Sequence, residues 1–164
     1  MLITEASGLL PSQVTGHHWV YAVGPAYEAD ASSTGKWLVF VPGRQIDRWW
    51  EQIRLATEQG CLGISAKAAT ACHNDLATSA RTKLICVYTR DWQDQDDVRR
   101  VLQQLRDLGV SWRLSYKTDE ATLSGVYGTG SAAYVSQPGS REFEDRTRPP
   151  ESPAERAHRT LRPP

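Results

Sequence analysis

Residues 35–67 read GKWLVFVPGRQIDRWWEQIRLATEQGCLGISAK, and this stretch decides the fold class. KWLVFV (36–41) and LGISAK (62–67) have the length and the pattern of β-strands. The segment between them carries large apolar residues at helical spacing and is closed by a glycine: Ile46, Trp49, Trp50, Ile53 and Gly60. Two strands joined by one amphipathic helix predict a sheet with that helix packed on a face.

The same alternation continues on both sides of this stretch. Further strands are predicted at 17–23, 83–89 and 112–117, with a closing hairpin or edge within 125–136. A second amphipathic helix starts at Asp94 or Asp96 and stops at Gly109. The order predicts an α+β fold, with a single curved, mostly antiparallel sheet and two helices packed on one face.

The chain has 164 residues, of which 40% are hydrophobic, and this suits one domain with one core. We expect that domain to span residues 1–137, with its core at about 17–136. From residue 138 onward the sequence contains six prolines, mixed charges and few apolar residues. Such a segment cannot bury enough surface to fold alone, so 138–164 is predicted to be a tail, disordered or laid across the surface.

Charge and cysteine content exclude several classes of protein. Nineteen basic residues balance nineteen acidic ones, which argues against a broad nucleic-acid surface but leaves a nucleotide ligand open. The three cysteines form no CxxC pair, so neither a disulfide scaffold nor a zinc or other metal site is expected. No apolar run reaches membrane-spanning length and the start lacks a basic leader, so we predict a soluble cytoplasmic protein without a membrane partner.

The predicted strands direct several cations to one face of the sheet. In 111–117, Trp112, Leu114 and Tyr116 alternate with Arg113 and Lys117. The same alternation in 62–67 separates Ala66 from Lys67, and Lys36 joins them if its strand has the matching orientation. The resulting cationic face carries Lys36, Lys67, Arg113 and Lys117. It suits a pocket for an anion such as a phosphate monoester, and the alternative is an ordinary solvated sheet face.

The tryptophans receive a simpler interpretation. Trp37, Trp49, Trp50 and Trp112 alternate onto apolar faces or stripes and are predicted to be core residues. Trp92, in the polar turn DWQDQ, is the tryptophan expected to be exposed.

The segments GKWLVFVP, LGISAK, LICVYTRDWQDQDDVRRVLQQLRDLG and LSYKTDEATLSGVYG resemble the Bles03 family of domains. The resemblance runs from about residue 35 to about residue 128. It implies the fold of the cap-binding translation initiation factor 4E.

A more distant resemblance is to the phosphothreonine lyases and to the lyase domains of lanthipeptide synthetases. It implies that Lys67 is the general base, that Lys36 takes part in catalysis and phosphate binding, and that Arg81 and Lys117 hold phosphate. Arg113 is a further candidate for phosphate binding because it lies on the cationic face. β-Elimination of phosphate needs a base for the α-proton, cations for the leaving group and an acid, and no metal or organic cofactor.

Two positions depart from the lyase pattern. Leu38 stands where the lyases carry the histidine that acts as general acid, so the acid has to come from elsewhere. The candidates are His17, His18, His73, Tyr88 and Lys36 itself. Lys117 replaces an arginine and lacks its bidentate grip on phosphate.

These observations leave two hypotheses. The first is a phosphothreonine or phosphoserine lyase that acts on a phosphorylated peptide or protein, supplied by a partner kinase. The second is a noncatalytic module of the same fold that binds a phosphopeptide, a nucleotide or a protein. Neither gives a role to Lys83, whose replacement is expected to matter least.

Overall fold

The computed structural model describes residues 8–28, 32–74, 81–120, 132–148, 152–154 and 157. The strands are β1 (Trp19–Val23), β2 (Gly35–Pro42), β3 (Ser65–Ala69), β4 (Thr82–Thr89), β5 (Leu114–Thr118), β6 (Tyr134–Ser136) and β7 (Glu144–Asp145). The helices are α1 (Ile46–Glu58) and α2 (Gln95–Asp107), with short 3-10 turns η1 (Pro11–Gln13) and η2 (Gly43–Gln45).

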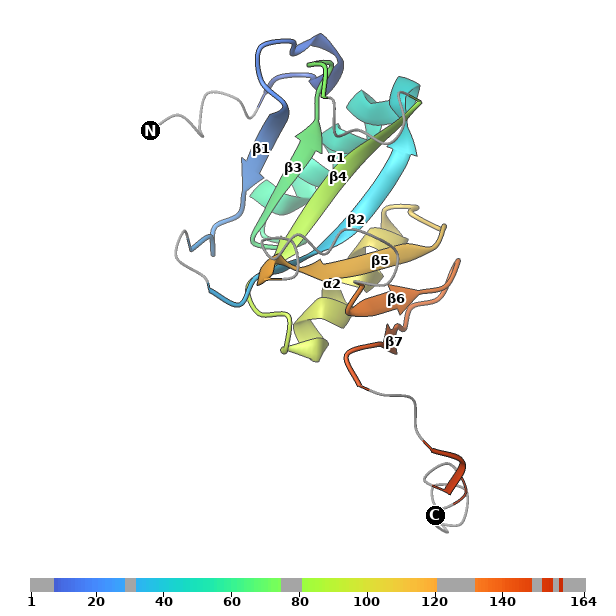
Figure 1. Ribbon diagram of the computed structural model, residues 1–164. Helices are drawn as coiled ribbons and strands as arrows, with labels where there is room; N and C mark the ends of the chain where they lie inside the picture. The colour runs from blue at the N-terminus through green and yellow to red at the C-terminus, as the bar shows by residue number, and fades with distance from the viewer. Residues whose placement is uncertain are drawn as a thin grey trace.

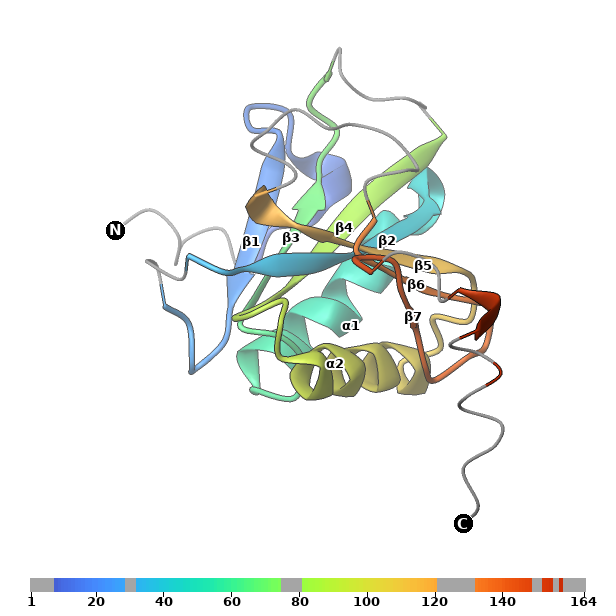
Figure 2. The same cartoon turned by 60° about the horizontal axis from the view of Figure 1, so that its bottom comes forward.

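In this described part of the chain the strands form one seven-stranded sheet, in the order β1-β3-β4-β2-β5-β6-β7. Every neighbouring pair is antiparallel. Both helices lie on the same face of the sheet (Figure 1 and Figure 2). The predicted α+β fold, with one open antiparallel sheet and two helices on one face, is confirmed.

The core lies between the sheet and the two helices. Trp37 of β2 is fully buried there, and its Nε1–H donates a hydrogen bond to the carbonyl oxygen of Val98 on α2, at 3.1 Å. Helix α1 contributes Ile46, Trp49, Trp50 and Ile53, and α2 contributes Val98, Val101, Leu102 and Leu105. Asp94 caps α2 by accepting a hydrogen bond from the Asp97 N–H, so one of the two predicted start points is correct.

Three strands begin later than predicted, and one of them, β1, starts at Trp19 rather than residue 17. β3 starts at Ser65 rather than residue 62, because Gly63 and Ile64 close against the end of β4, where Ile64 N–H donates to the Tyr88 carbonyl at 3.0 Å. β5 starts at Leu114, since Trp112 lies in the preceding turn with its ring 5.3 Å from that of Trp49. Of the closing element expected within 125–136, residues 125–131 lie outside the described residues, and β6 forms the rest.

The prediction that Trp92 is exposed is wrong. Its side chain is half-buried against the core. Its backbone N–H donates to the Ser33 carbonyl at 2.9 Å, and its carbonyl accepts a hydrogen bond from the Tyr134 hydroxyl at 2.7 Å. The turn before α2 is therefore fastened to two other segments, and this draws the indole inward.

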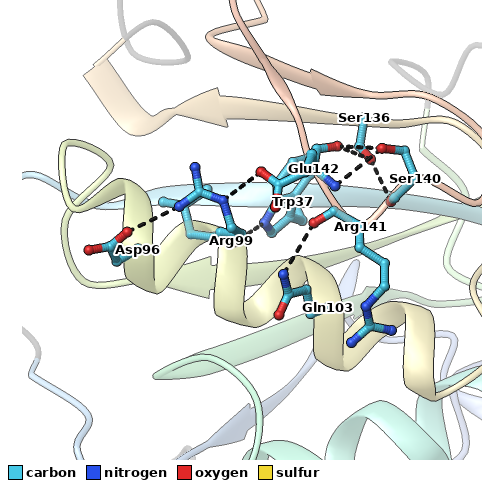
Figure 3. Close-up of polar contacts among 9 residues, drawn as sticks. Trp37, Asp96, Arg99, Gln103, Ser136, Ser140, Arg141 and Glu142 are labelled. Atoms are coloured by element: carbon cyan, nitrogen blue, oxygen red, sulfur yellow. Dashed lines mark hydrogen bonds and ion pairs between the residues drawn. The ribbon is translucent and has the colours of Figure 1, made fainter. Parts of the chain in front are cut away.

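Residues 138–148, the first part of the Pro-rich segment, pack against the edge of the sheet. β7 pairs with β6, and the Phe143 ring packs 4.5 Å from that of Tyr134. On the other side, Arg99 of α2 donates from Nε to the Glu142 carboxylate at 2.7 Å (Figure 3). This segment closes the β6 edge of the sheet and joins it to α2.

Neither helix of the described residues is long and apolar enough to cross a membrane. The cytoplasmic location of the protein stays a prediction.

We expect Phe143→Ala to lower the free energy of unfolding by about 2 kcal/mol, because it removes a half-buried ring that packs on Tyr134 and on Trp37. Urea unfolding followed by tryptophan fluorescence measures the change. The control is Arg146→Ala, which alters an exposed side chain of the same segment. Equal unfolding midpoints for Phe143→Ala and the wild type would contradict a structural role for this segment.

Candidate functional site

The face of the sheet opposite the two helices, here called the open face, carries the three predicted lysines. On β2, Lys36 points to this face, since its neighbour Trp37 is buried on the helix side. Lys36 pairs with Lys117 on β5 and with Tyr88 on β4. Lys67 on β3 pairs with Cys86 of β4, two residues before Tyr88. The structure thus brings Lys36, Lys67 and Lys117 to one face, and we call them the lysine cluster.

Lys36 is the most buried member of the cluster, with 7% of its surface exposed. Its ammonium forms an ion pair with Asp119 at 2.5 Å. The other carboxylate oxygen of Asp119 accepts a hydrogen bond from the Thr34 hydroxyl, and the Asp119 N–H donates to the Thr34 carbonyl at 2.9 Å. Asp119 therefore compensates the charge of Lys36 and holds its ammonium in place.

Lys67 has a different environment. Its ammonium lies 4.1 Å from the centre of the Trp19 ring and 5.9 Å from that of Tyr88. Within the described part of the chain it makes no hydrogen bond and no ion pair. Burial lowers the pKa of Lys67; Cys86 opposes this, Lys36 adds to it, and Asp119 opposes it weakly. Lys67 is thus the amine of the cluster that loses its proton more readily than an ordinary lysine.

Tyr88 and Cys86 lie between the lysines. The Lys36 ammonium is 5.4 Å from the centre of the Tyr88 ring, so both Lys36 and Lys67 lie over the same phenol. Burial raises the pKa of the Tyr88 hydroxyl above its ordinary value. Burial also raises the pKa of the Cys86 thiol, to about 11. Both groups are therefore protonated at neutral pH, and the partly exposed Tyr88 can donate a hydrogen bond toward an anion, whereas Cys86 is fully buried.

Arg113 and Lys117 extend the cationic surface along β5. Lys117 is half-buried, while Arg113 is exposed with Nη1 3.5 Å from the Ser115 hydroxyl. Arg113, Ser115 and Lys117 alternate with the buried residues Leu114 and Tyr116, as predicted. Arg113 precedes Lys117 by four residues, so it lies toward the rim of the open face rather than beside Lys36.

The structure separates Arg81 from the lysine cluster. Arg81 directly precedes β4, whose first residue, Thr82, pairs with Pro42 at the end of β2. Tyr88, the partner of Lys36, comes seven residues after Arg81, which is about 23 Å along a strand. Arg81 and Lys36 therefore do not hold the same phosphate, and the site implied by the resemblance loses this member.

Among the candidate general acids, Tyr88 is the one that contacts the cluster lysines through its side chain. His17 and His18 are exposed and precede β1, and their carbonyls accept hydrogen bonds from Thr70. His73 is exposed and follows the end of β3. Within the described residues, no group of three or more His, Cys, Asp or Glu side chains is arranged to hold a metal ion.

Sequence reasoning missed two residues of the site. Asp119 follows Lys117 by two residues, so the period of a strand already directs it to the same face. Trp19 alternates with buried Val20 in the first strand, which directs its ring to the open face. Asp119 contacts Lys36 and Trp19 contacts Lys67, and both contacts join segments that are distant in the sequence. The alternation within one strand does not predict such contacts.

Fold and site together define a small α+β domain with a lysine cluster on the open face of its sheet. The family model described as basophilic leukemia-expressed protein Bles03 matches residues 25–123. This is more than half of the chain, and the protein belongs to the Bles03 family. All three cluster lysines and Asp119 lie within the matched residues, whereas Trp19 and Phe143 lie outside them. The resemblance to this family is confirmed; the wider resemblances stay predictions.

The lowered pKa of Lys67 predicts a pH dependence of stability. Between its folded pKa and the ordinary value of 10.5, the unfolded chain binds more protons at this side chain than the folded chain does. The contribution of Lys67 to the free energy of unfolding therefore rises as the pH rises through that window.

We test this with Lys67→Met, which lacks the titration. Chemical denaturation of both proteins at about pH 7 and about pH 10 gives their difference in unfolding free energy. The difference should move in favour of the wild type at the higher pH. The same difference at both pH values would contradict a lowered pKa for Lys67.

Proposed function

We propose that this protein is a lyase that eliminates phosphate from phosphothreonine or phosphoserine in a peptide. The neutral amine of Lys67 takes the proton from Cα of the substrate residue. The electron pair of that bond forms the Cα–Cβ double bond, and the Cβ–O bond breaks. Phosphate leaves with a proton from a general acid, and a dehydroamino acid stays in the peptide. The reaction needs no metal and no organic cofactor.

The observation that carries this proposal is the environment of Lys67. A lysine acts as a base only when it is neutral, and partial burial next to another cation favours the neutral form. Lys67 also makes no ion pair or hydrogen bond with the described residues, so its lone pair is not engaged elsewhere.

The other cluster members suit the leaving group. Lys36 and Lys117 lie side by side on β2 and β5, so a phosphate at this place would contact the ammonium of Lys117 and that of Lys36, which Asp119 holds in position. Tyr88, which stays protonated, is our candidate for the acid. Arg113 adds positive charge at the rim. The resemblance to phosphothreonine lyases and lanthipeptide synthetase lyase domains, and to the fold of initiation factor 4E, supports this assignment. A cytoplasmic kinase would supply the substrate.

Leu38 favours a second candidate, a noncatalytic module that binds a phosphopeptide, nucleotide or protein. Leu38 pairs with Cys86 and Ser115 on the open face, where the resemblance implies a histidine acid. An apolar side chain cannot protonate a leaving group. If neither Tyr88 nor Lys36 replaces that acid, the lysine cluster would bind phosphate without cleaving the Cβ–O bond.

Incubation with phosphothreonine and phosphoserine peptides tests the lyase proposal. Mass spectrometry should detect peptide that has lost the elements of phosphoric acid. Lys67→Met should lower the rate by about 10²–10⁴-fold, the usual contribution of a general base. The control, Arg48→Gln, removes an exposed cation on α1 and should keep full activity. If neither peptide reacts, but one binds with an affinity that depends on Lys67, the protein is the binding module.

Asp119→Asn separates positioning from charge. It releases the ammonium of Lys36 and removes a carboxylate that competes with the phosphate for it, so the affinity for the phosphopeptide should fall several-fold if positioning dominates and rise if charge dominates. It also removes a negative charge that raises the pKa of Lys67, so the rise of the elimination rate with pH should move to lower pH.

The control for this experiment is Asp107→Asn, which breaks the exposed ion pair with Arg141 at 2.7 Å. It should leave both peptide affinity and the pH profile unchanged. An unchanged pH profile in Asp119→Asn would show that Asp119 does not act on the proposed base.

A further inference from the structure

The two edges of the described sheet, β1 and β7, differ in how they are protected from pairing with another chain (Figure 1). β7 consists of Glu144 and Asp145, and charged side chains on an edge strand discourage such pairing. β1 has the sequence WVYAV and carries neither a charge nor a proline. Residues 8–27 as a whole contain no Asp, Glu, Lys or Arg, although these types make up 23% of the chain. The β1 edge thus lacks the usual features that keep an edge strand unpaired.

The outer side of β1 presents backbone hydrogen-bonding groups. In an antiparallel ladder, residues that bond to the neighbouring strand alternate with residues whose N–H and C=O groups point away from it. The Gly24 N–H donates to the Ile64 carbonyl, just before β3, at 2.8 Å, so the even-numbered residues of this segment bond toward β3. Trp19, Tyr21 and Val23 therefore point their backbone groups outward. Within the described part of the chain, no strand pairs with that side of β1.

Exposed apolar side chains are concentrated in the segment that contains this edge strand. Seven large apolar side chains are exposed in the described part of the chain, and five of them belong to residues 9–27: Leu9, Leu10, Tyr21, Val23 and Tyr27. Tyr21 and Val23 lie on β1 itself and are 42% and 37% exposed, while the other three flank β1 in the sequence. Exposed apolar surface beside unpaired backbone groups indicates a protein–protein contact.

We infer that two copies of this chain pair through β1 and join their sheets into one. When the two β1 strands are antiparallel with Tyr21 opposite Tyr21, Trp19 of each copy lies opposite Val23 of the other. All these residues point their backbone groups outward, so each pair exchanges two hydrogen bonds. Aromatic–aromatic and aromatic–β-branched pairs are favourable across strands. The edge is therefore complementary to itself, and a net charge of zero adds no repulsion between the copies.

The pairing would also complete the surroundings of Lys67. The Trp19 ring lies 4.1 Å from the Lys67 ammonium. In the dimer, Val23 of the partner copy lies opposite Trp19, about 5.5 Å away between Cα atoms. The partner copy thus borders the lysine cluster without adding a charge to it. The inference does not depend on the lyase proposal, because it rests on the backbone and the side chains of β1.

Sedimentation equilibrium of the full chain over micromolar concentrations tests the inference and should give the mass of two chains. Tyr21→Lys should weaken the association by about tenfold or more, because it places like charges directly opposite each other. Tyr21→Glu should do the same. A mixture of these two variants should form a dimer again, since a lysine then lies opposite a glutamate. The control is Phe40→Lys, which changes an exposed apolar residue of β2, three strands away, and should leave the association unchanged.

A mass of one chain at every concentration would overturn the inference. A dimer that persists in both Tyr21 variants, or that Phe40→Lys dissociates, would also overturn it. If the mixed variants stay monomeric, the inferred pairing of Tyr21 with itself is wrong, whereas their association shows that each variant is folded. The elimination assay is a separate readout. A dimer without elimination would refute the lyase alone, and elimination by a monomer would refute the dimer alone.

Discussion

The pairing of β2 with both β4 and β5 is the constraint on which the rest of this structure depends. Trp37 is fully buried on the helix side of β2 and donates to the backbone of α2, so its neighbours Lys36 and Leu38 have to face the other way. The two registers then place Tyr88 and Lys117 beside Lys36. A shift of the β2 register by one residue would turn the Lys36 side chain into the core. Burying that charge would cost more free energy than any contact on the open face contributes.

Two lysines of the cluster, Lys36 and Lys67, differ in how their charge is compensated. Lys36, almost buried, has an anionic partner in Asp119, whereas in the described part of the chain Lys67 contacts aromatic rings and lies near a thiol. Burial makes the charged form of Lys67 less favourable than that of an ordinary lysine, and the Trp19 ring at 4.1 Å offsets part of this cost. Such an arrangement is common where a group has to change its protonation state during function. It is uncommon in a surface that exists only to be solvated.

Local patterns in the sequence were sufficient to predict both helices, strands β1 to β5 and the faces of β3 and β5. The alternation of Leu114 and Tyr116 with Lys117, and the stripe that starts after Asp94, each lie within one segment, so neighbours in sequence determine them. The position of Arg81 was not predictable in this way, because it depends on how far β4 runs along β2. The packing of residues 138–148 against the sheet was not predictable either. It depends on the contact of one aromatic ring, Phe143, with the distant Tyr134, in a segment that is otherwise polar.

In the proposed chemistry the base and the acid act on different atoms of the substrate. A base has to be near Cα, and an acid near the leaving oxygen, but cations can lower the need for an acid by neutralising the departing phosphate. Leu38 removes a proton donor from β2 while Lys36, on the same strand, and Lys117 opposite it supply two positive charges. In the proposed reaction Tyr88 would be the proton donor beside Lys36 and Lys67; because burial raises the pKa of its hydroxyl, the transfer would depend on the neighbouring ammonium groups to stabilise the leaving phosphate.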